Sequence, residues 1–238
     1  RLPIYILFAG TFFPTHAGWV LFSLYLLGIL MAMATARLMR RFFYKVDETP
    51  FVMELPPYRL PTWRSTLSHM WDKSAQYLRK MGGLILVASL IVWFLSYFPR
   101  PAEGVSEAAH YENSYLGRIG HWCEPLVEPL GLNWKSGVAI LSGISAKEIV
   151  VSTLGVLYSN DAGTTETSLS QTLRESGDFT PASALAFLVF SLIYFPCIAT
   201  VAAVRSEAGR GWACATMLYN TVVAWLMAWG VYHLALIL

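Results

Sequence analysis

Apolar stretches long enough to cross a membrane alternate with polar segments along this chain. Residues 17–36 run for twenty positions without a charge, and a helix of about twenty residues spans the hydrocarbon core of a bilayer. Further runs predict spans at about 82–99, 182–204 and 211–237. Residues 2–13 are apolar but too short to cross, so we expect the tail of a helix that starts upstream, in a longer protein of which this chain is a fragment. The pattern predicts an all-α, polytopic transmembrane helix bundle with interrupted helices and amphipathic surface helices.

Another apolar run, residues 135–158, carries Lys147 and Glu148 near its centre. A charge in the middle of a membrane helix costs about 2.5–3.5 kcal/mol on insertion scales, so ionisable residues there usually face a protein interior or a water-filled path. Because neighbours along a helix point in different directions, we expect no ion pair between these two residues. The run is either one span with functional charges or two short pieces with the charges at an interface between them.

The polar segments predict the side of the membrane on which each loop lies. Residues 37–80 hold nine of the seventeen Lys and Arg residues, which places this loop in the cytoplasm. Within it, residues 62–81 repeat apolar side chains at helical spacing and predict an amphipathic helix along the inner surface. Residues 100–134 carry five Glu and two basic residues, so we expect a periplasmic loop with a short surface helix over 115–130. Residues 159–180 are rich in Ser, Thr, Gly and Asp and predict a polar loop without a site.

This topology contains one conflict. If every apolar run crosses the membrane once, Arg205 and Arg210 fall on the outer side, against the tendency of basic residues to stay inside. A re-entrant segment among the runs would remove the conflict. The sequence leaves it open whether 135–158 and 182–204 cross fully or re-enter.

Composition narrows the class of protein. The chain is 55% hydrophobic and 13% charged, whereas soluble domains are roughly one quarter charged. The net charge is only +2, and the basic residues do not form a phosphate-tracking pattern, so we expect no nucleic-acid partner. Three cysteines without CxxC spacing predict neither a structural zinc site nor a disulfide framework. No GxxxxGK[ST] motif occurs, so any nucleotide chemistry belongs to another part of the protein.

Pro196 and Cys197 interrupt the run at 182–204. Proline lacks a backbone donor and clashes with the preceding turn, so we expect a kink or break there. Cys197 would then lie in the first turn of the following half-helix, where the helix dipole favours a thiolate, the form that binds metals. A small packing residue is the alternative role for a lone membrane cysteine. With the interruption around Lys147, this break gives the paired pattern typical of a transport site built from discontinuous helices.

We therefore predict a path through the membrane at these two interruptions. Cys197 and Glu148 are the candidate metal ligands, and a thiolate with a carboxylate suits a borderline divalent ion such as Fe²⁺, although Mn²⁺, Co²⁺ and Zn²⁺ stay open. Lys147 would repel a cation, so we expect a structural or gating role for it. Hydroxyl groups near the breaks either supply oxygen ligands or bond their own helix carbonyls. The remaining candidate path or gating residues are Gly143, Ser145, Ser152, Pro196 and Thr200.

Four motifs carry a resemblance to a known family. They are RLPIY at 1–5 followed by FFP at 12–14, PFVMELP at 50–56, AKEIVVSTL at 146–154 and YFPCIAT at 194–200. Together, and in this order over essentially the whole chain, they resemble the C-terminal membrane half of ferrous iron transport protein B. The resemblance implies gate-type repeats: residues 1–38 end the first repeat, 39–81 form a cytoplasmic loop, and 82–238 make up the second repeat.

The resemblance also implies a function. The family is composed of multi-pass importers of Fe²⁺ in the bacterial inner membrane, in which GTP and Mg²⁺ bind a separate N-terminal domain, so this chain itself is not expected to be an enzyme. Cys197 would lie on the ion path, with a counterpart in the first repeat, upstream of Arg1. Met53 and Glu54 would lie near the entry to the nucleotide-driven machinery. Expected partners are Fe²⁺, the lipid bilayer, the GTP-binding domain, further copies of the protein and small accessory proteins.

Three other functions compete with this one. A gate-fold carrier for nucleosides or similar organic solutes has the same architecture. An integral membrane enzyme would need paired acidic residues at a membrane face, whereas the four aspartates are scattered in polar segments. A structural anchor for a cytoplasmic domain would explain the basic loop but gives no reason for the two interruptions.

Overall fold

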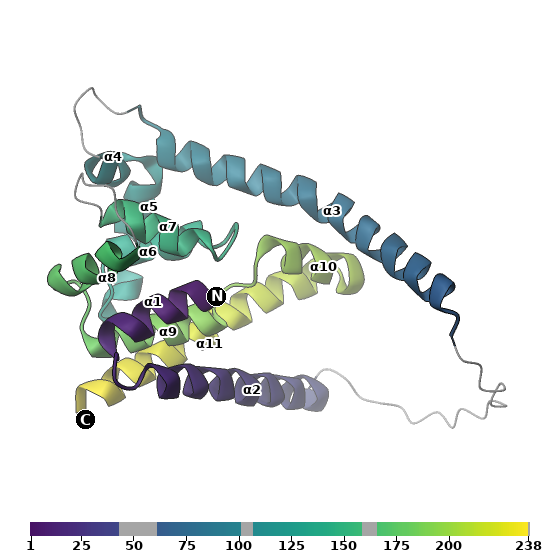
Figure 1. Cartoon of the computed structure of the whole chain (residues 1–238), viewed down its shortest axis with the longest axis horizontal. Coiled ribbons are helices and arrows are strands. Elements are labelled where there is room, and N and C mark those ends of the chain that lie inside the picture. The colour runs from purple at the N-terminus through teal and green to yellow at the C-terminus, as the bar shows by residue number, and fades with distance from the viewer. Residues whose placement is uncertain (43–60, 101–106, 159–165, 238) are drawn as a thin grey trace.

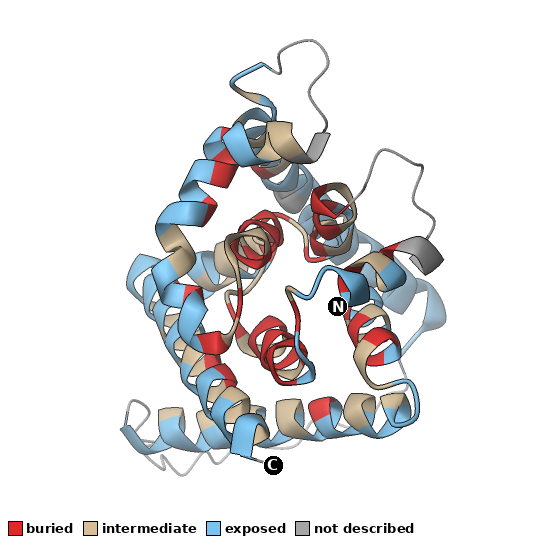
Figure 2. Ribbon diagram, turned by 90° about the vertical axis from the view of Figure 1, so that its left-hand side faces the viewer, coloured by how far each residue is buried: buried red, intermediate tan, exposed pale blue. Residues whose placement is uncertain are grey.

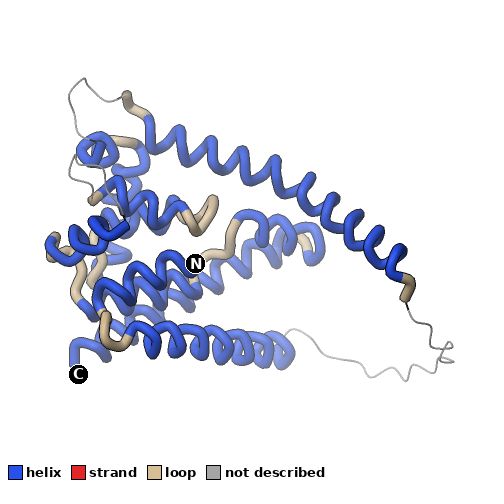
Figure 3. The backbone as a smooth tube through the Cα atoms, in the orientation of Figure 1, coloured by secondary structure: helices blue, strands red, loops and turns tan. Residues whose placement is uncertain are grey.

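The computed structural model describes residues 1–42, 61–100, 107–158 and 166–237, and every regular element within these ranges is helical (Figure 3). The helical architecture predicted from the sequence is therefore confirmed. Figure 1 labels the elements, whose bounds are as follows. They are α1 (Leu2–Phe12), α2 (Ala17–Phe42), α3 (Trp63–Tyr97), α4 (Glu107–Asn113), α5 (Tyr115–Val127), the 3₁₀ turn η1 (Glu128–Leu130), α6 (Trp134–Ser142), α7 (Ile149–Leu157), α8 (Glu166–Glu175), α9 (Pro181–Ile193), α10 (Ile198–Ala208) and α11 (Arg210–Ile237).

Four stretches of the described chain are long and apolar enough to cross a membrane. They are Ala17–Phe42, Trp63–Tyr97, Arg210–Ile237 and the interrupted pair α9 and α10, Pro181–Ala208. Most of the surface of α2 and α3 is exposed, as Figure 2 shows in pale blue. Apolar side chains on the outside of a span are suited to contact with lipid. The chain is therefore a membrane protein.

Helix α9 forms the centre of the bundle. It packs along α11 and also contacts α1 and α2, and its residues from Ala182 to Ser191 are almost all buried (Figure 2). Its first turn is fixed by a capping box, in which Thr180 and Ser183 each accept a hydrogen bond from the other's backbone N–H. This rigid helix leads directly into the break at Pro196.

Helix α3 differs from the sequence-based prediction. We expected a surface helix over 62–81 and a separate span over 82–99, but one 35-residue helix runs through both. Gly82 and Gly83 at the junction lower helix propensity, yet unlike proline they keep their backbone donors and cause no clash. A helix of this length extends about 52 Å and exceeds the hydrocarbon thickness. Its N-terminal part accordingly projects away from the bundle (Figure 1).

The run at 135–158 is not one continuous helix. Helices α6 and α7 have nine residues each and are separated by residues 143–148. A nine-residue helix is about 14 Å long and cannot cross the membrane alone. Of the two interpretations left open by the sequence, the one with two short pieces is correct.

The polar segment 159–180 was expected to be a loop, and the structure corrects this for its second half. Helix α8 packs against α1 and buries Leu169 and Leu173, which lie four residues apart on one face. Two leucines at helical spacing dock this otherwise polar segment. The sequence-based prediction missed them because the average composition of a segment conceals such a pair. The surface helix expected at 115–130 is confirmed as α5 followed by η1.

Aromatic side chains link α1 to α9 in the core. Phe8 is fully buried, with ring centroids 4.7 Å from Phe187, 5.1 Å from Phe179 and 6.0 Å from Phe12. Such pairs stabilise beyond their buried area. This cluster holds the short helix α1 against the helix that enters the break.

We expect Phe8→Ala to lower the free energy of unfolding by about 3 kcal/mol, because the substitution leaves a cavity in a fully packed site. Unfolding of the full-length protein by SDS in mixed micelles measures the change. Phe22→Ala on α2 is the matched control, because Phe22 is 57% exposed. Equal losses for the two variants would contradict the assignment of Phe8 to the core.

Candidate functional site

Two helix breaks lie at the centre of the candidate site. Between α6 and α7 the chain makes tight turns, in which the N–H of Ile144 bonds Leu141 O at 3.1 Å and the N–H of Ile149 bonds Ala146 O at 3.1 Å. Between α9 and α10, Pro196 follows the last helical hydrogen bond, from Tyr194 N to Phe190 O at 2.8 Å. The break predicted at Pro196 is confirmed, and Gly143 begins the other break, also as predicted.

Tyr194 connects the two breaks. A methyl group added at Gly143 would overlap the Tyr194 hydroxyl and the Val150 side chain, so the tyrosine packs directly on the glycine. The ring of Tyr194 also lies under the Lys147 ammonium, with Nζ 4.1 Å from the ring centroid. Tyr194 is only 2% exposed. One side chain from the second break therefore contacts both ends of the first.

Tyr194 was missed as a site residue by the sequence analysis, where it appeared only within a motif. An aromatic residue immediately before a Phe-Pro break is a weak signal by itself, because buried aromatics usually pack the core. The glycine opposite it, at the other break, is the partner that gives Tyr194 its role, and no spacing rule in a single sequence connects positions 143 and 194.

Lys147 is buried, with 7% of its surface exposed. Its Nζ has no hydrogen-bond or ion-pair partner within the described residues, and its close contact is the face of the Tyr194 ring. An ammonium over an aromatic face is attracted to the ring quadrupole. Glu148 is exposed, so the two neighbours point in different directions, as the sequence predicted.

Cys197 begins α10 at its N-cap position and is partly exposed. Its Sγ lies 3.2 Å from the Thr200 Oγ1, and Thr200 is exposed. The structure thus brings together three predicted residues, Pro196, Cys197 and Thr200, at the start of one half-helix. The positive end of a helix dipole at this position favours a negatively charged group.

The other predicted residues lie at the first break or beyond it. Ser145 is buried and donates a hydrogen bond to Ser142 O at 3.0 Å, which is the local alternative weighed from the sequence. Ser152 is exposed on α7. Within the described ranges, no group of three His, Cys, Asp or Glu side chains gathers into a metal site. No hydrogen bond in the described chain joins Glu148 to Cys197.

A second polar cluster connects the N-terminal end of α6 to the C-terminal end of α7. These are the outer ends of the two helices, away from the break between them. The Tyr158 hydroxyl donates to Asp178 Oδ2 at 2.9 Å and accepts from Asn133 Nδ2 at 3.3 Å. Lys135 Nζ lies 3.5 Å from Asp178 Oδ2 and 4.5 Å from the centre of the Tyr158 ring. Burial raises the pKa of Tyr158, so the hydroxyl keeps the proton it donates. We shall call these four residues the outer clasp.

A cavity of about 480 Å³ adjoins the outer clasp. It is lined by His121, Glu124, Pro125, Glu128, Gly131, Leu132, Asn133 and Asp178. Two of these side chains face each other, with His121 Nδ1 3.3 Å from Glu124 Oε2. Asp178 in the outer clasp belongs to the segment in which the sequence analysis expected no site, and its interactions there are structural.

These features define the class: a polytopic helical membrane protein in which two interrupted helix pairs meet. Comparison with known families agrees. A family described as "Gate: Nucleoside recognition" matches residues 78–211, and one described as "Ferrous iron transport protein B C terminus" matches residues 21–73. The chain belongs to the gate family, and its residues 21–73 and its relatives align it with ferrous iron transport protein B.

Relatives align along the whole chain. An Fe(2+) transport protein A/Fe(2+) transporter FeoB fusion protein of Porphyromonas gingivalis is 44% identical over 100% of this chain and 33% of its own length. The Fe(2+) transporter FeoB of Campylobacter jejuni is 38% identical over 100% of this chain and 40% of its own length. That of Methanocaldococcus jannaschii is 39% identical over 96% and 34%, respectively. The chain thus spans between a third and two fifths of these relatives. No solved structure matches it.

We expect Gly143→Ala to destabilise the protein by about 1–3 kcal/mol, because its new methyl group would overlap Tyr194 and Val150. The backbone at Gly143 is right-handed (φ −67°, ψ −7°), so the cost is steric alone. SDS unfolding of the full-length protein measures it.

Two further variants test the cause of that loss. Gly143→Ala combined with Tyr194→Phe should recover part of the stability, because the hydroxyl is removed. Gly155→Ala in α7 is the control, since its added methyl would meet Leu169 Cδ2 at an ordinary 3.9 Å. Full stability of Gly143→Ala would show that Tyr194 does not pack on Gly143.

Proposed function

We propose that this chain is the permeation part of a GTP-dependent importer of Fe²⁺ in the bacterial inner membrane. The observation that carries the proposal is the meeting of two helix breaks at Tyr194, with the Cys197 sulfur at the start of α10. Relatives that align with the whole chain bear the name Fe(2+) transporter. Broken membrane helices with free backbone groups are the usual setting of a transport site.

The donor atoms at the second break suit a borderline divalent cation. Cys197 Sγ and Thr200 Oγ1 lie 3.2 Å apart and come from one turn of α10. Sulfur ligands favour transition metals over Mg²⁺ and Ca²⁺, which prefer oxygen. We assign Cys197 as the sulfur ligand and Thr200 as an oxygen ligand. Pro196 keeps the backbone open beside them.

Glu148 supplies the carboxylate in this proposal. It is exposed at the start of α7, outside the core that buries Lys147. An exposed carboxylate can exchange ligands with a hydrated ion before the ion loses water. Glu148 therefore receives Fe²⁺, and Cys197 binds it further along the path. Gly143 and Ser145 shape the turn from which Lys147 and Glu148 extend, and Ser152 lies one helical turn beyond Glu148.

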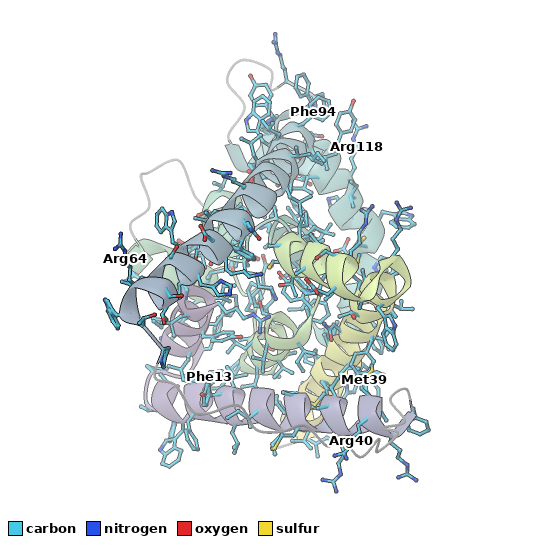
Figure 4. All side chains as sticks on the ribbon, turned by 90° about the vertical axis from the view of Figure 1, so that its right-hand side faces the viewer. Phe13, Met39, Arg40, Arg64, Phe94 and Arg118 are labelled. Carbon is cyan, nitrogen blue, oxygen red and sulfur yellow. The ribbon has the colours of Figure 1, made fainter. Side chains whose placement is uncertain are left out.

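The arrangement of the short helices supports an orientation in the membrane. When α6 and α7 re-enter instead of crossing, Arg205 and Arg210 fall on the same side as residues 37–80, which we assign to the cytoplasm. The ends of α2 and α10 lie at one end of the bundle (Figure 1), and Figure 4 displays Arg40 and Arg64 pointing outward there. Residues 100–134 are then periplasmic. This removes the conflict noted in the sequence.

The remainder of the importer supplies the energy. We propose that an N-terminal domain binds GTP and Mg²⁺, and that residues 39–81 connect it to the second gate repeat, 82–238, while residues 1–38 end the first repeat. Met53 and Glu54, proposed to lie near that connection, are outside the described residues. Further copies of the protein and small accessory proteins complete the proposed set of partners.

A nucleoside carrier is the second candidate function, because the matched gate family carries the description "Nucleoside recognition". The two functions separate in an uptake panel with radiolabelled nucleosides and ⁵⁵Fe²⁺. Iron uptake that a ferrous chelator abolishes, without nucleoside uptake, supports the importer. Nucleoside uptake indifferent to the chelator would replace it.

We expect Cys197→Ser in the full-length protein to lower Fe²⁺ uptake at least about tenfold while expression stays normal, because a neutral hydroxyl is a much weaker ligand than a thiolate. Uptake in an iron-uptake-deficient strain is the measurement. Cys214→Ser on the exposed side of α11 is the matched control. Normal uptake by a well-expressed Cys197→Ser protein would remove Cys197 from the path.

Glu148→Gln should weaken Fe²⁺ binding by about tenfold, since it replaces a charged ligand with a neutral amide of the same shape. An anaerobic Fe²⁺ titration of the purified protein checks the affinity. Glu207→Gln, an exposed position near the end of α10, controls for the general loss of negative charge. Unchanged affinity of Glu148→Gln would mean that Glu148 is not a ligand.

A further inference from the structure

The Lys147 ammonium is the most unfavourably placed charge in the described chain. Its surface is 93% buried, and Nζ makes no hydrogen bond or ion pair with any described residue. A buried charge normally has a counter-charge and hydrogen bonds. Lys147 has instead the face of the Tyr194 ring, 4.1 Å from Nζ. In the part of the chain that the structure describes, Lys147 therefore lacks the partners that usually stabilise a buried charge, and a function would explain its position.

Among the described residues, no carboxylate pairs with Lys147. Glu148, the nearest acid in sequence, is exposed. The carboxylates that form ion pairs in the described ranges are Glu124 and Asp178, which line the outer cavity. Arg1 donates a hydrogen bond to Leu192 O at 2.7 Å, two residues before Tyr194, and adds a second positive charge near this break. Among the described residues, Lys147 is therefore held by the Tyr194 ring, an electron-rich group that carries no full charge.

The same break also holds the Cys197 sulfur. Cys197 follows Tyr194, whose ring contacts the Lys147 ammonium, by three residues in the same break. An aromatic face attracts an ammonium, and a cysteine sulfur binds borderline metal ions. The second break, in which the proposed function places the transported metal, thus already contacts a cation of the protein through the Tyr194 ring.

We infer that Lys147 is a tethered cation that occupies the place of the metal beside Cys197 while the path is empty, and that Fe²⁺ must displace it in order to bind. This inference rests on the proposed function and adds a residue that sets metal affinity. Two cations cannot share one set of electron-rich groups in a poorly screened site, because their repulsion is strong there. Lys147 consequently weakens metal binding at Cys197 and promotes release.

The local structure permits the displacement. Lys147 lies in the irregular segment between α6 and α7, and its Nζ is held by a ring contact alone among the described residues. A lysine carries its charge on a flexible four-carbon stem, so Nζ can move several ångströms without a change in the backbone. The outer clasp keeps the far ends of α6 and α7 fixed during this movement.

Protection of Cys197 from alkylation tests the inference. The full-length protein in nanodiscs is treated anaerobically with N-ethylmaleimide over a range of Fe²⁺ concentrations, and peptide mass spectrometry quantifies the modified Cys197. In Lys147→Met, which has a similar shape but no charge, the half-protective Fe²⁺ concentration should fall about tenfold. In Lys147→Arg, which retains the charge, it should stay within about twofold of wild type.

The outcomes separate this inference from the proposed function. An unchanged or raised half-protective concentration in Lys147→Met overturns the inference alone. Absence of any protection of wild-type Cys197 by Fe²⁺ overturns the assignment of Cys197 as a ligand and the inference with it. A merely structural lysine would weaken protection on substitution, whereas a competing cation strengthens protection when its charge is removed.

A measurement on the wild-type protein covers the case in which the variants do not fold. Reductive methylation with formaldehyde and dimethylamine borane modifies accessible lysines, and Lys147 should react slowly because it is buried. Saturating Fe²⁺ should increase methylation of Lys147 severalfold, because displacement moves Nζ towards water. Lys135, partly exposed in the outer clasp, is the internal control and should not change. Unchanged methylation of Lys147 at saturating Fe²⁺ overturns the inference.

Discussion

The contact of Tyr194 with Gly143 and Lys147 is the interaction on which the site depends. Breaking two helices inside a membrane exposes backbone groups to an apolar solvent, so both breaks must be buried against other parts of the protein. Here each break helps to bury the other. The absence of a side chain at Gly143 lets the Tyr194 ring approach, and among the described residues this ring is the contact that stabilises the buried ammonium.

The two ends of the short helices are held in different ways. At the outer end, Asn133, Lys135, Tyr158 and Asp178 connect through directional hydrogen bonds and an ion pair. At the break, the Tyr194 hydroxyl, Ser191 Oγ and Lys147 Nζ are buried without hydrogen-bond partners in the described chain. Unpaired buried polar groups cost free energy. The outer ends of α6 and α7 are thus held by hydrogen bonds, whereas polar groups at the break lack partners among the residues that the structure describes. The break is also where the proposed cargo would bind and leave.

The sequence predicts the fold and the candidate site well where a single residue determines the local backbone. Pro196 removes a donor and collides with the preceding turn, so the break was visible without a structure. The continuity of α3 could not be predicted, because two glycines weaken a helix without preventing it. Tertiary packing then determines whether the helix continues. Leu169 and Leu173 docked α8 despite its polar composition. The role of Tyr194 depends on a contact across 51 positions of sequence, which local patterns do not encode. The proposed ligands Cys197 and Glu148 were found as residues, but their spatial relation was not.

The central claim is that a metal ion binds the sulfur of Cys197 where the two breaks meet. X-ray absorption spectroscopy of the full-length protein, loaded anaerobically with one equivalent of Fe²⁺, tests it most directly. The account predicts a sulfur shell around iron in the wild-type protein that is absent in Cys197→Ser. A coordination shell of nitrogen and oxygen only, identical in the two proteins, would contradict it.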